Sequence, residues 1–271
     1  MIICGDFHFH LNSKGGNGAL KRAHKALMNA AHLDFLCSTE HAYKNPVEAY
    51  YYLAEASANT KTSVIPGVEA ISKEGIDLIA IFRSVDELKK SIFNTPFSWS
   101  IFDLDNVSGD AIIIMPHMFT PSKTGVVTTL GQDAAMRIVE RCDYVEVNNG
   151  AFYDLVHSGV SHVFPKKYRR KIEMTASMPP LQIPKTGGYS IGSDAHEPWG
   201  MNIYGIADVD SEFFQESIFD ILNRRLKFTT AASSQYRSGA IGGSARAFSS
   251  GITSVSEFII KSKKRKNNAK A

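Results

Sequence analysis

Asp6-Phe7-His8-Phe9-His10 follows the short apolar run Met1-Ile2-Ile3-Cys4 at the start of the chain. Because the side chains of a β-strand alternate between its two faces, we expect both histidines on one face and both phenylalanines on the other. Two imidazoles on one side at the end of a strand form half of a metal site. The pair alone is equally compatible with two structural histidines, so the interpretation depends on the residues at the ends of the other strands.

Composition places few limits on function but excludes some classes. The 271 residues are 44% hydrophobic and 21% charged, with a formal net charge of +3. No apolar run approaches the roughly 20 residues that span a bilayer, and no basic region precedes the first apolar run, which argues against a signal peptide. Cys4, Cys37 and Cys142 are widely spaced and form no C-x-x-C pair, so we expect reduced core thiols in a cytoplasmic protein.

Apolar strand-like runs alternate with amphipathic helix-like runs over most of the chain. The expected strands are 2–4, 35–37, 63–65, 77–82, 111–114, 144–147 and 189–192, with a short added strand at 203–206. The expected helices are 17–31, 46–58, 85–93, 132–141 and 213–223. This alternation predicts an α/β protein with a parallel sheet covered on both faces. Seven such units favour a closed parallel (β/α)7 TIM-like barrel over an open, doubly wound sheet.

The end of the chain differs from the rest in composition. The stretch 238–251 is rich in Gly, Ser and Ala, and Lys261-Ser262-Lys263-Lys264-Arg265-Lys266 is strongly basic. We therefore assign residues 1–236 to the barrel domain and residues 237–271 to a flexible, partly disordered extension with a basic tail. Such a tail is usually just solvated, although it can also contact nucleic acid.

Polar residues follow six of the expected strands. They are Asp6, His8 and His10, then Glu40 and His41, then Glu69, then His117, then Glu146, Asn148 and Asn149, and finally Asp194 and His196. In a parallel barrel the carboxyl ends of the strands meet at one mouth. Imidazoles and carboxylates are the ligands of Zn, Mn and Fe, so the sequence predicts a metal site there.

These motifs resemble the PHP (polymerase and histidinol phosphatase) family in order and spacing over roughly residues 1 to 230. The motifs are Asp6-Phe7-His8-Phe9-His10, Ser38-Thr39-Glu40-His41, Pro66-Gly67-Val68-Glu69, Pro116-His117 and Gly192-Ser193-Asp194-Ala195-His196. The resemblance implies a distorted seven-stranded barrel that holds one to three divalent metal ions. It also implies hydrolysis of phosphate esters by metal-activated water.

The resemblance also implies which residues hold each ion. His8, His10, Glu69 and Asp194 would hold one ion. Glu69 would bridge to a second ion that His117 also binds, and His41 and His196 would hold a third. The expected catalytic residues are Glu69, Asp194, His196 and Glu146, the last of which could instead orient a ligand histidine or act only as a strand-end hydrogen-bonding residue.

Two positions depart from the family pattern. The window Lys14-Gly15-Gly16-Asn17 holds no strong ligand where the family usually has Asp or His, leaving only Asn12 or Asn17 as weak donors. The strand that contains Ile79 lacks the histidine usual in the family, with Asp77 as the only nearby oxygen donor. The second and third metal positions are therefore each expected to be one ligand short, which could reduce activity.

Three functions remain open on the sequence alone. The first is a phosphomonoesterase or phosphodiesterase acting on a phosphorylated small molecule or nucleotide, with Lys14, Arg83, Lys123 and His157 as candidate phosphate contacts, although each of them is better explained as a solvated surface residue. The second is a nuclease, because the stretch 116–121 with Gly125 looks like part of a DNA-endonuclease branch of the family. The third is a barrel with reduced activity that serves as a binding module. No membrane partner is expected, and the oligomeric state is not predicted.

Overall fold

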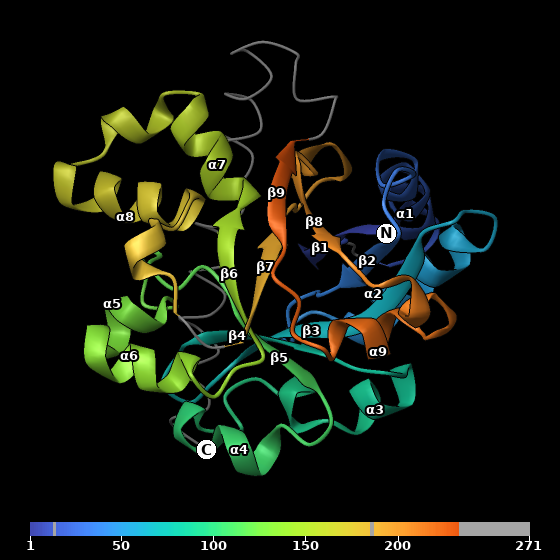
Figure 1. Ribbon diagram of the computed structural model, residues 1–271, viewed down its shortest axis with the longest axis horizontal. Coiled ribbons are helices and arrows are strands. Elements are labelled where there is room, and N and C mark those ends of the chain that lie inside the picture. The colour runs from blue at the N-terminus through green and yellow to red at the C-terminus, as the bar shows by residue number, and fades with distance from the viewer. Residues whose placement is uncertain (13–14, 185–186, 233–271) are drawn as a thin grey trace.

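Within the described residues, nine strands form one sheet that curls into a nearly closed barrel (Figure 1). The computed structural model describes residues 1–12, 15–184 and 187–232. The strands are β1 (Ile2–Phe9), β2 (Phe35–Ser38), β3 (Ser63–Ile71), β4 (Asp77–Ile81), β5 (Ile112–Met115), β6 (Tyr144–Asn149), β7 (Gly188–Gly192), β8 (Ile203–Asp208) and β9 (Thr229–Ala232). Their order across the sheet is β7-β6-β5-β4-β3-β2-β1-β8-β9.

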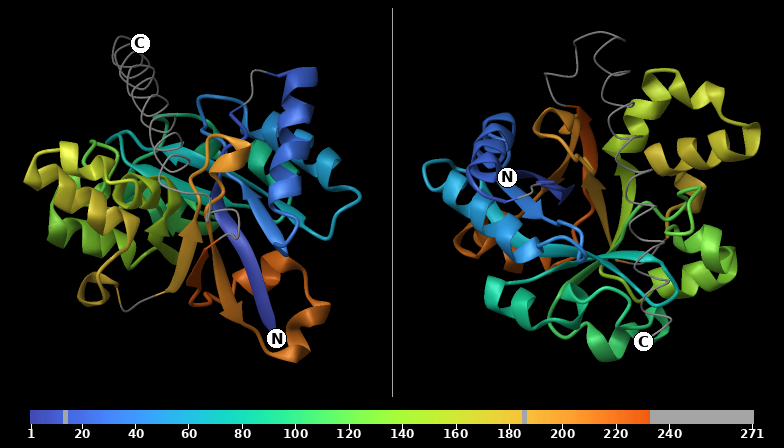
Figure 2. Two further views of the ribbon diagram at one scale, coloured as in Figure 1. Left: turned by 90° about the horizontal axis from the view of Figure 1, so that it is seen from above. Right: turned by 180° about the vertical axis from the view of Figure 1, so that it is seen from behind.

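Helices surround this sheet and cover its outer face (Figure 2). The α-helices are α1 (Asn17–Asn29), α2 (Pro46–Ser57), α3 (Val85–Lys90), α4 (Leu104–Val107), α5 (Val126–Leu130), α6 (Gln132–Val139), α7 (Gly150–His157), α8 (Lys166–Ala176) and α9 (Ile218–Leu222). The 3-10 helices are η1 (Ile92–Asn94), η2 (Ile101–Asp103), η3 (Val160–Val163), η4 (Pro180–Gln182), η5 (Pro198–Gly200) and η6 (Ser211–Gln215). The expected helix at 213–223 is therefore divided between η6 and α9.

The prediction of a seven-stranded parallel barrel is wrong in both strand number and strand direction. β4 runs antiparallel to β3 and to β5, and β8 runs antiparallel to β1 and to β9. Only five residues connect β3 to β4, and Gly75 within them has φ 86°. A connection this short forms a hairpin, because a parallel crossover needs a dozen or more residues. The alternation of apolar segments did not distinguish a hairpin from a crossover.

Two further differences affect the mouth of the barrel. β3 is longer than expected and runs to Ile71, so Glu69 lies inside this strand rather than after it. The chain after β7 returns beside β1, where the Asp194 N–H donates to the His8 carbonyl at 2.7 Å and the His10 N–H donates to the Ala195 carbonyl at 3.0 Å. These contacts bring residues from the two ends of the described chain together at the barrel mouth.

The core below the mouth contains packed aromatic rings. Phe7 lies with its ring centroid 5.1 Å from that of Phe35, 5.3 Å from that of Tyr144 and 4.8 Å from that of Phe228. Phe7 points into this core from β1, whereas His8, next to it on the strand, belongs to the group of polar side chains at the mouth, as the alternation of side chains predicts. The strand therefore supports the core with one face and presents its histidines with the other.

The cysteines and the helices can be compared with the predictions from the sequence, whereas the C-terminal extension cannot. Cys37 and Cys142 are buried, Cys4 is half-buried, and all three are free thiols. No helix in the described ranges has the length and apolar character needed to cross a bilayer. The predicted flexible extension at 237–271 and the residue Lys14 lie outside the described residues.

Candidate metal centre

The structure brings the predicted metal ligands into one buried cluster at the barrel mouth. Each of them is at most 8% exposed: His8, His10, His41, Glu69, His117, Asp194 and His196. They come from β1, β3 and the segments that follow β1, β2, β5 and β7. Their donor atoms fall into three overlapping groups, and the atoms within each group lie within 4.8 Å of one another.

The first group contains His8, His10 and Asp194. The Nε2 atoms of the two histidines are 2.9 Å apart. Asp194 Oδ1 lies 3.6 Å from His8 Nε2 and 3.3 Å from His10 Nε2. The carboxylate oxygens of Glu69 lie 3.8 Å from His8 Nε2 and 3.7 Å from His10 Nε2, which places Glu69 at the edge of this group.

The other two groups each share one histidine with the first. His8 belongs to the second group, with Glu69 and His117, in which His117 Nε2 lies 3.0 Å from Glu69 Oε1. His10 belongs to the third group, in which His41 Nε2 and His196 Nε2 are 3.4 Å apart. Glu69 Oε2 also contacts His41 Nδ1, so this carboxylate joins the second and third groups.

The carboxylate of Glu146 contacts two of the predicted ligands, His8 and His117. Its Oε1 lies 3.0 Å from His8 Nδ1, and its Oε2 accepts a hydrogen bond of 2.8 Å from the backbone N–H of His117. Asn149 donates from Nδ2 both to Glu146 Oε2 at 3.0 Å and to Asp194 Oδ2 at 3.1 Å. A carboxylate on Nδ1 fixes the imidazole tautomer and leaves Nε2 of His8 as the donor that faces the cluster.

Two residues outside the predicted ligand set also hold this region together. Asp6 Oδ1 accepts hydrogen bonds from the backbone N–H groups of His8 at 3.0 Å and Ser193 at 2.9 Å. Arg22 on α1 donates from Nη2 to the carbonyl of His196 at 2.9 Å and from Nε to the carbonyl of Leu11 at 3.0 Å. No sequence motif marks Arg22, because its partners lie on other elements.

Backbone strain is concentrated at the cluster. Asn12, His117 and Asp194 have φ values of 49°, 25° and 49°, a region that non-glycine residues rarely adopt. Such conformations cost on the order of 1–3 kcal/mol each and persist where the surrounding contacts enforce them. In this cluster Glu146 holds the N–H of His117, and the His8 carbonyl holds the N–H of Asp194. Strain of this kind is commonly found at functional sites.

The charges in the cluster compensate one another. Burial by itself lowers the pKa of His8, but the negative charges of Asp194, Glu146 and Glu69 raise it to about 10. Burial raises the pKa of Asp194, but the charge of His8 and the contacts with His10 and His196 hold it well below its usual range. Burial and the charges of His41 and His196 lower the pKa of His10, so its imidazole is neutral and able to donate a lone pair.

Comparison with solved structures shows that this fold is shared. The crystal structure of PsfC from Pseudomonas syringae PB-5123 aligns with a TM-score of 0.57 and 17% identity over 92% of this chain and 98% of that chain. A structure of endonuclease Q in complex with a 27-mer duplex that has an abasic lesion at the active site aligns with a TM-score of 0.47 and 14% identity, over 83% of this chain and 56% of that chain. Endonuclease Q from Pyrococcus furiosus gives a TM-score of 0.46 and 14% identity, over 85% of this chain and 58% of that chain. No family model matches the chain, and no curated protein is similar to it in sequence.

The donor set fits divalent transition-metal ions. Five buried histidines and two buried carboxylates contribute nitrogen and oxygen donors, the ligands that Zn, Mn and Fe accept. Two facing imidazole nitrogens can share only one proton, and the 2.9 Å between His8 Nε2 and His10 Nε2 suits a hydrogen bond in the absence of an ion. An ion would replace that shared proton and satisfy both lone pairs.

Metal binding is therefore expected to release a proton from His8. Because the pKa of His8 is raised to about 10, its imidazole carries a proton at neutral pH when no ion is bound. An ion must displace that proton, so the apparent affinity should rise about tenfold per pH unit between pH 6 and 8. Isothermal titration calorimetry with zinc in buffers of different protonation enthalpy should show about one proton released by the first ion. A pH-independent affinity without proton release would contradict a protonated His8 in the metal-free protein.

The two departures from the expected ligand pattern are visible in the structure. Ile79 is fully buried on β4 directly beside Glu69, so an apolar side chain occupies this position of the second group. At the other position, Asn12 Oδ1 accepts a hydrogen bond of 2.9 Å from Lys44 Nζ. Lys44 Nζ also lies 3.5 Å from Glu40 Oε1, whose carboxylate lies 3.6 Å from His10 Nδ1.

The other candidate phosphate contacts do not lie in the cluster. Arg83 forms an ion pair of 2.7 Å with Asp220. His157 stacks on Tyr153 with ring centroids 3.7 Å apart, and Lys123 is exposed.

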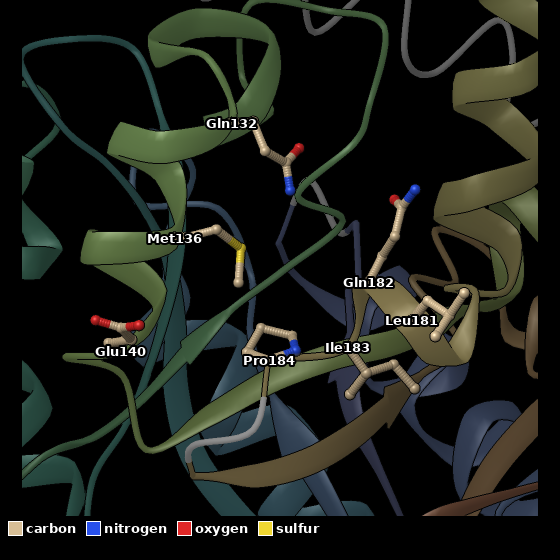
Figure 3. A pocket seen from close by; sticks show the side chains of 7 residues that line it. All are labelled: Gln132, Met136, Glu140, Leu181, Gln182, Ile183 and Pro184. Atoms are coloured by element: carbon tan, nitrogen blue, oxygen red, sulfur yellow. The ribbon is translucent and has the colours of Figure 1, made fainter.

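A groove of about 350 Å³ between α6 and the η4 region is lined by Met136, Leu181 and other residues outside the cluster (Figure 3). The chemistry is therefore concentrated at the barrel mouth rather than in this groove.

Proposed function

We propose that this protein is a metal-dependent hydrolase of phosphate esters that belongs to the PHP family. The observation that supports this most strongly is the set of three overlapping donor groups joined by His8, His10 and Glu69. Ions held by adjacent groups would lie within a few ångströms of one another. This spacing suits the binding of both the attacking and the leaving oxygen of a phosphoryl group.

The residues of the chain take separate roles in this proposal. The seven buried ligands would hold one to three ions of Zn, Mn or Fe, and these ions would supply activated water and neutralise charge on the phosphate oxygens. Glu69 would bridge the second and third groups through its two oxygens. Glu146 orients His8 and holds the strained backbone of His117. Asp194 and His196, each 8% exposed, are the most accessible of the seven ligands and would lie nearest to the bound phosphate ester.

The proposed activity can be tested with p-nitrophenyl phosphate and bis(p-nitrophenyl) phosphate, which separate monoesterase from diesterase activity. We expect hydrolysis that needs added Zn, Mn or Fe(II) and that falls by on the order of 10³-fold in His8→Ala and in Asp194→Ala. The exposed His24 on α1 provides a matched control, because His24→Ala removes an imidazole outside the cluster. Cluster variants that hydrolyse both compounds as fast as the parent protein would show that the site does not act in this way.

Metal content distinguishes an enzyme from a barrel that serves only as a binding module. The parent protein, purified without chelators, is expected to contain at least one transition-metal ion per chain by mass spectrometry of the metals. Well below one ion per chain, together with no hydrolysis after metal addition, would favour the binding module.

A further inference from the structure

The segment η3–α8 carries an unusual concentration of positive charge. Between Gly150 and Ser177 the basic residues are Lys166, Lys167, Arg169, Arg170 and Lys171, whereas the acidic residues are Asp154, which is buried, and Glu173. The whole chain carries a net charge of only +3. This short part of the chain therefore forms a local basic surface on a nearly neutral protein.

Most of this positive charge is not neutralised by neighbouring acids. Glu173 lies 3.6 Å from Arg169, which also contacts His162. Lys166, Lys167 and Arg170 are exposed, and among the described residues no carboxylate lies within ion-pair distance of them. Lys166 and Arg170 are four positions apart and therefore lie on the same face of α8. An exposed row of uncompensated cations attracts polyanions.

Two exposed aromatic side chains belong to the same segment, and Tyr168, two positions from both Lys166 and Arg170, lies on another side of α8 than that row. Tyr168 on α8 is 46% exposed, and Phe164, just before the helix, is 40% exposed. The combination of exposed aromatic rings and basic residues is the pattern by which proteins bind single-stranded nucleic acid, with rings stacking on bases and cations contacting phosphates.

This surface is rigidly linked to the metal centre. Asn149 caps the N-terminus of α7: its Oδ1 accepts the N–H of Phe152 while its Nδ2 donates to Asp194. α8 packs against α7 and ends where the Ala176 carbonyl accepts a hydrogen bond of 3.2 Å from Asn148. Figure 1 shows the two helices side by side next to the carboxyl end of β6. A nucleic-acid chain bound to α8 would therefore lie on the pair of helices α7 and α8, which begins beside the cluster.

Lys171 connects the basic surface to the segment that carries His117. Its Nζ donates to Thr128 Oγ1 at 2.8 Å, and that hydroxyl donates to the Thr120 carbonyl at 2.6 Å. The Thr120 N–H in turn donates to the His117 carbonyl at 2.9 Å. These hydrogen bonds therefore connect α8 to the segment that carries His117.

From these contacts we infer that the exposed face of η3–α8 binds single-stranded nucleic acid and delivers its phosphodiester backbone to the metal centre. The inference rests on the proposed phosphoesterase function and names its substrate class. An anionic membrane could also attract basic and aromatic residues, but the connection of this surface to the phosphate-ester site favours a polyanionic substrate.

The test measures binding separately from hydrolysis, on the full-length chain in EDTA, with a fluorescent single-stranded DNA or RNA of about 16 nucleotides. The triple variant Lys166→Glu, Lys167→Glu, Arg170→Glu should bind at least tenfold more weakly than the parent at about 100 mM salt. Its plot of log affinity against log salt concentration should be less steep by about 2, because about three phosphate contacts are lost. Comparing the DNA with the RNA probe shows which sugar the surface prefers.

Two matched controls separate this surface from charge and folding effects. The triple variant Lys25→Glu, Lys73→Glu, Lys90→Glu carries the same charge change at exposed positions elsewhere and should keep nearly the affinity of the parent. Tyr168→Ala should lose roughly tenfold in affinity with an unchanged salt slope, whereas Tyr168→Phe should retain the affinity because the ring can still stack. Equal weakening by both triple variants would overturn the inference.

Three further results separate this inference from the proposed hydrolase function and from membrane binding. A parent protein that hydrolyses p-nitrophenyl phosphate but binds no oligonucleotide would leave the proposed function intact and overturn this inference. Binding that depends on α8 in a protein without hydrolytic activity would support the surface and contradict the proposed function. Sedimentation with phosphatidylserine vesicles that is lost in the α8 triple variant, with unchanged oligonucleotide affinity, would overturn the inference in favour of a membrane surface.

Discussion

Replacing His10 with alanine is expected to reduce hydrolysis by on the order of 10³-fold or more and, in a parent that holds three metal ions, to lower the number of bound ions by two. His10 is fully buried and belongs to two of the three donor groups, so its loss leaves each group with two donors. Two protein ligands hold a transition-metal ion far more weakly than three. Metal analysis by mass spectrometry and hydrolysis of p-nitrophenyl phosphate measure the two effects on the same preparation.

The neighbouring histidines provide the comparison for this variant. His41→Ala removes a donor from one group only, so it should lower the metal content by one ion and leave the group of His8, His10 and Asp194 complete. Circular dichroism should show folded protein for both variants. If His10→Ala and His41→Ala lose the same number of ions, His10 is not shared between two groups as the geometry indicates.

Gly192→Ala is expected to weaken metal binding by 10- to 100-fold, although Gly192 has no side chain to bind an ion. A Cβ atom at this position would lie 2.3 Å from Glu146 Oε1 and 2.4 Å from His8 Cβ. Real atoms do not approach so closely, so His8, Glu146 or the backbone between them must shift, and we expect this shift to disturb the 3.0 Å contact between His8 and Glu146. The crowding should also lower the free energy of unfolding by about 1–3 kcal/mol.

A second glycine separates this packing effect from the general effect of adding a methyl group. Gly18 lies in α1, and a Cβ there would meet no atom within 4 Å. Gly18→Ala should therefore leave metal affinity unchanged and raise stability by about 0.4–1 kcal/mol, because alanine has less conformational freedom in the unfolded chain. Titration with zinc and thermal unfolding test both variants. Unchanged zinc affinity in Gly192→Ala would show that the positions of His8 and Glu146 do not control the site.

The order of the strands shows where sequence patterns were insufficient. An apolar run identifies a buried strand, and eight of the nine strands overlap a predicted one, β8 among them as the short added strand. The missed strand was β9, whose side chains are mostly exposed. Strand direction depends on the length of the connection and on which neighbour supplies hydrogen bonds, and the β3–β4 hairpin shows that five residues suffice for an antiparallel pair.

The residues that support the ligands show a similar limit. Glu146 was one of several carboxylates whose role the sequence left open, and only the 3.0 Å contact with His8 distinguishes it from a solvated strand end. Arg22 contacts the carbonyl of His196, which is 174 positions away in the chain. The position of Glu146 near a strand end marked it as a candidate without fixing its role, and Arg22 carries no local signal at all, because its partners lie on other elements.

The amino-acid sequence by itself determined the kind of donors in this protein and placed most of them near the ends of strands, whereas Glu69 lies inside β3. Histidine and carboxylate side chains bind transition metals wherever they occur, and the alternation along β1 fixes the common direction of His8 and His10. Only the tertiary structure decided how these donors are grouped, that His8 and His10 are each shared, and that α8 extends from the same site. The physical reason is that distances between residues far apart in the chain depend on strand order and packing, which no local pattern contains.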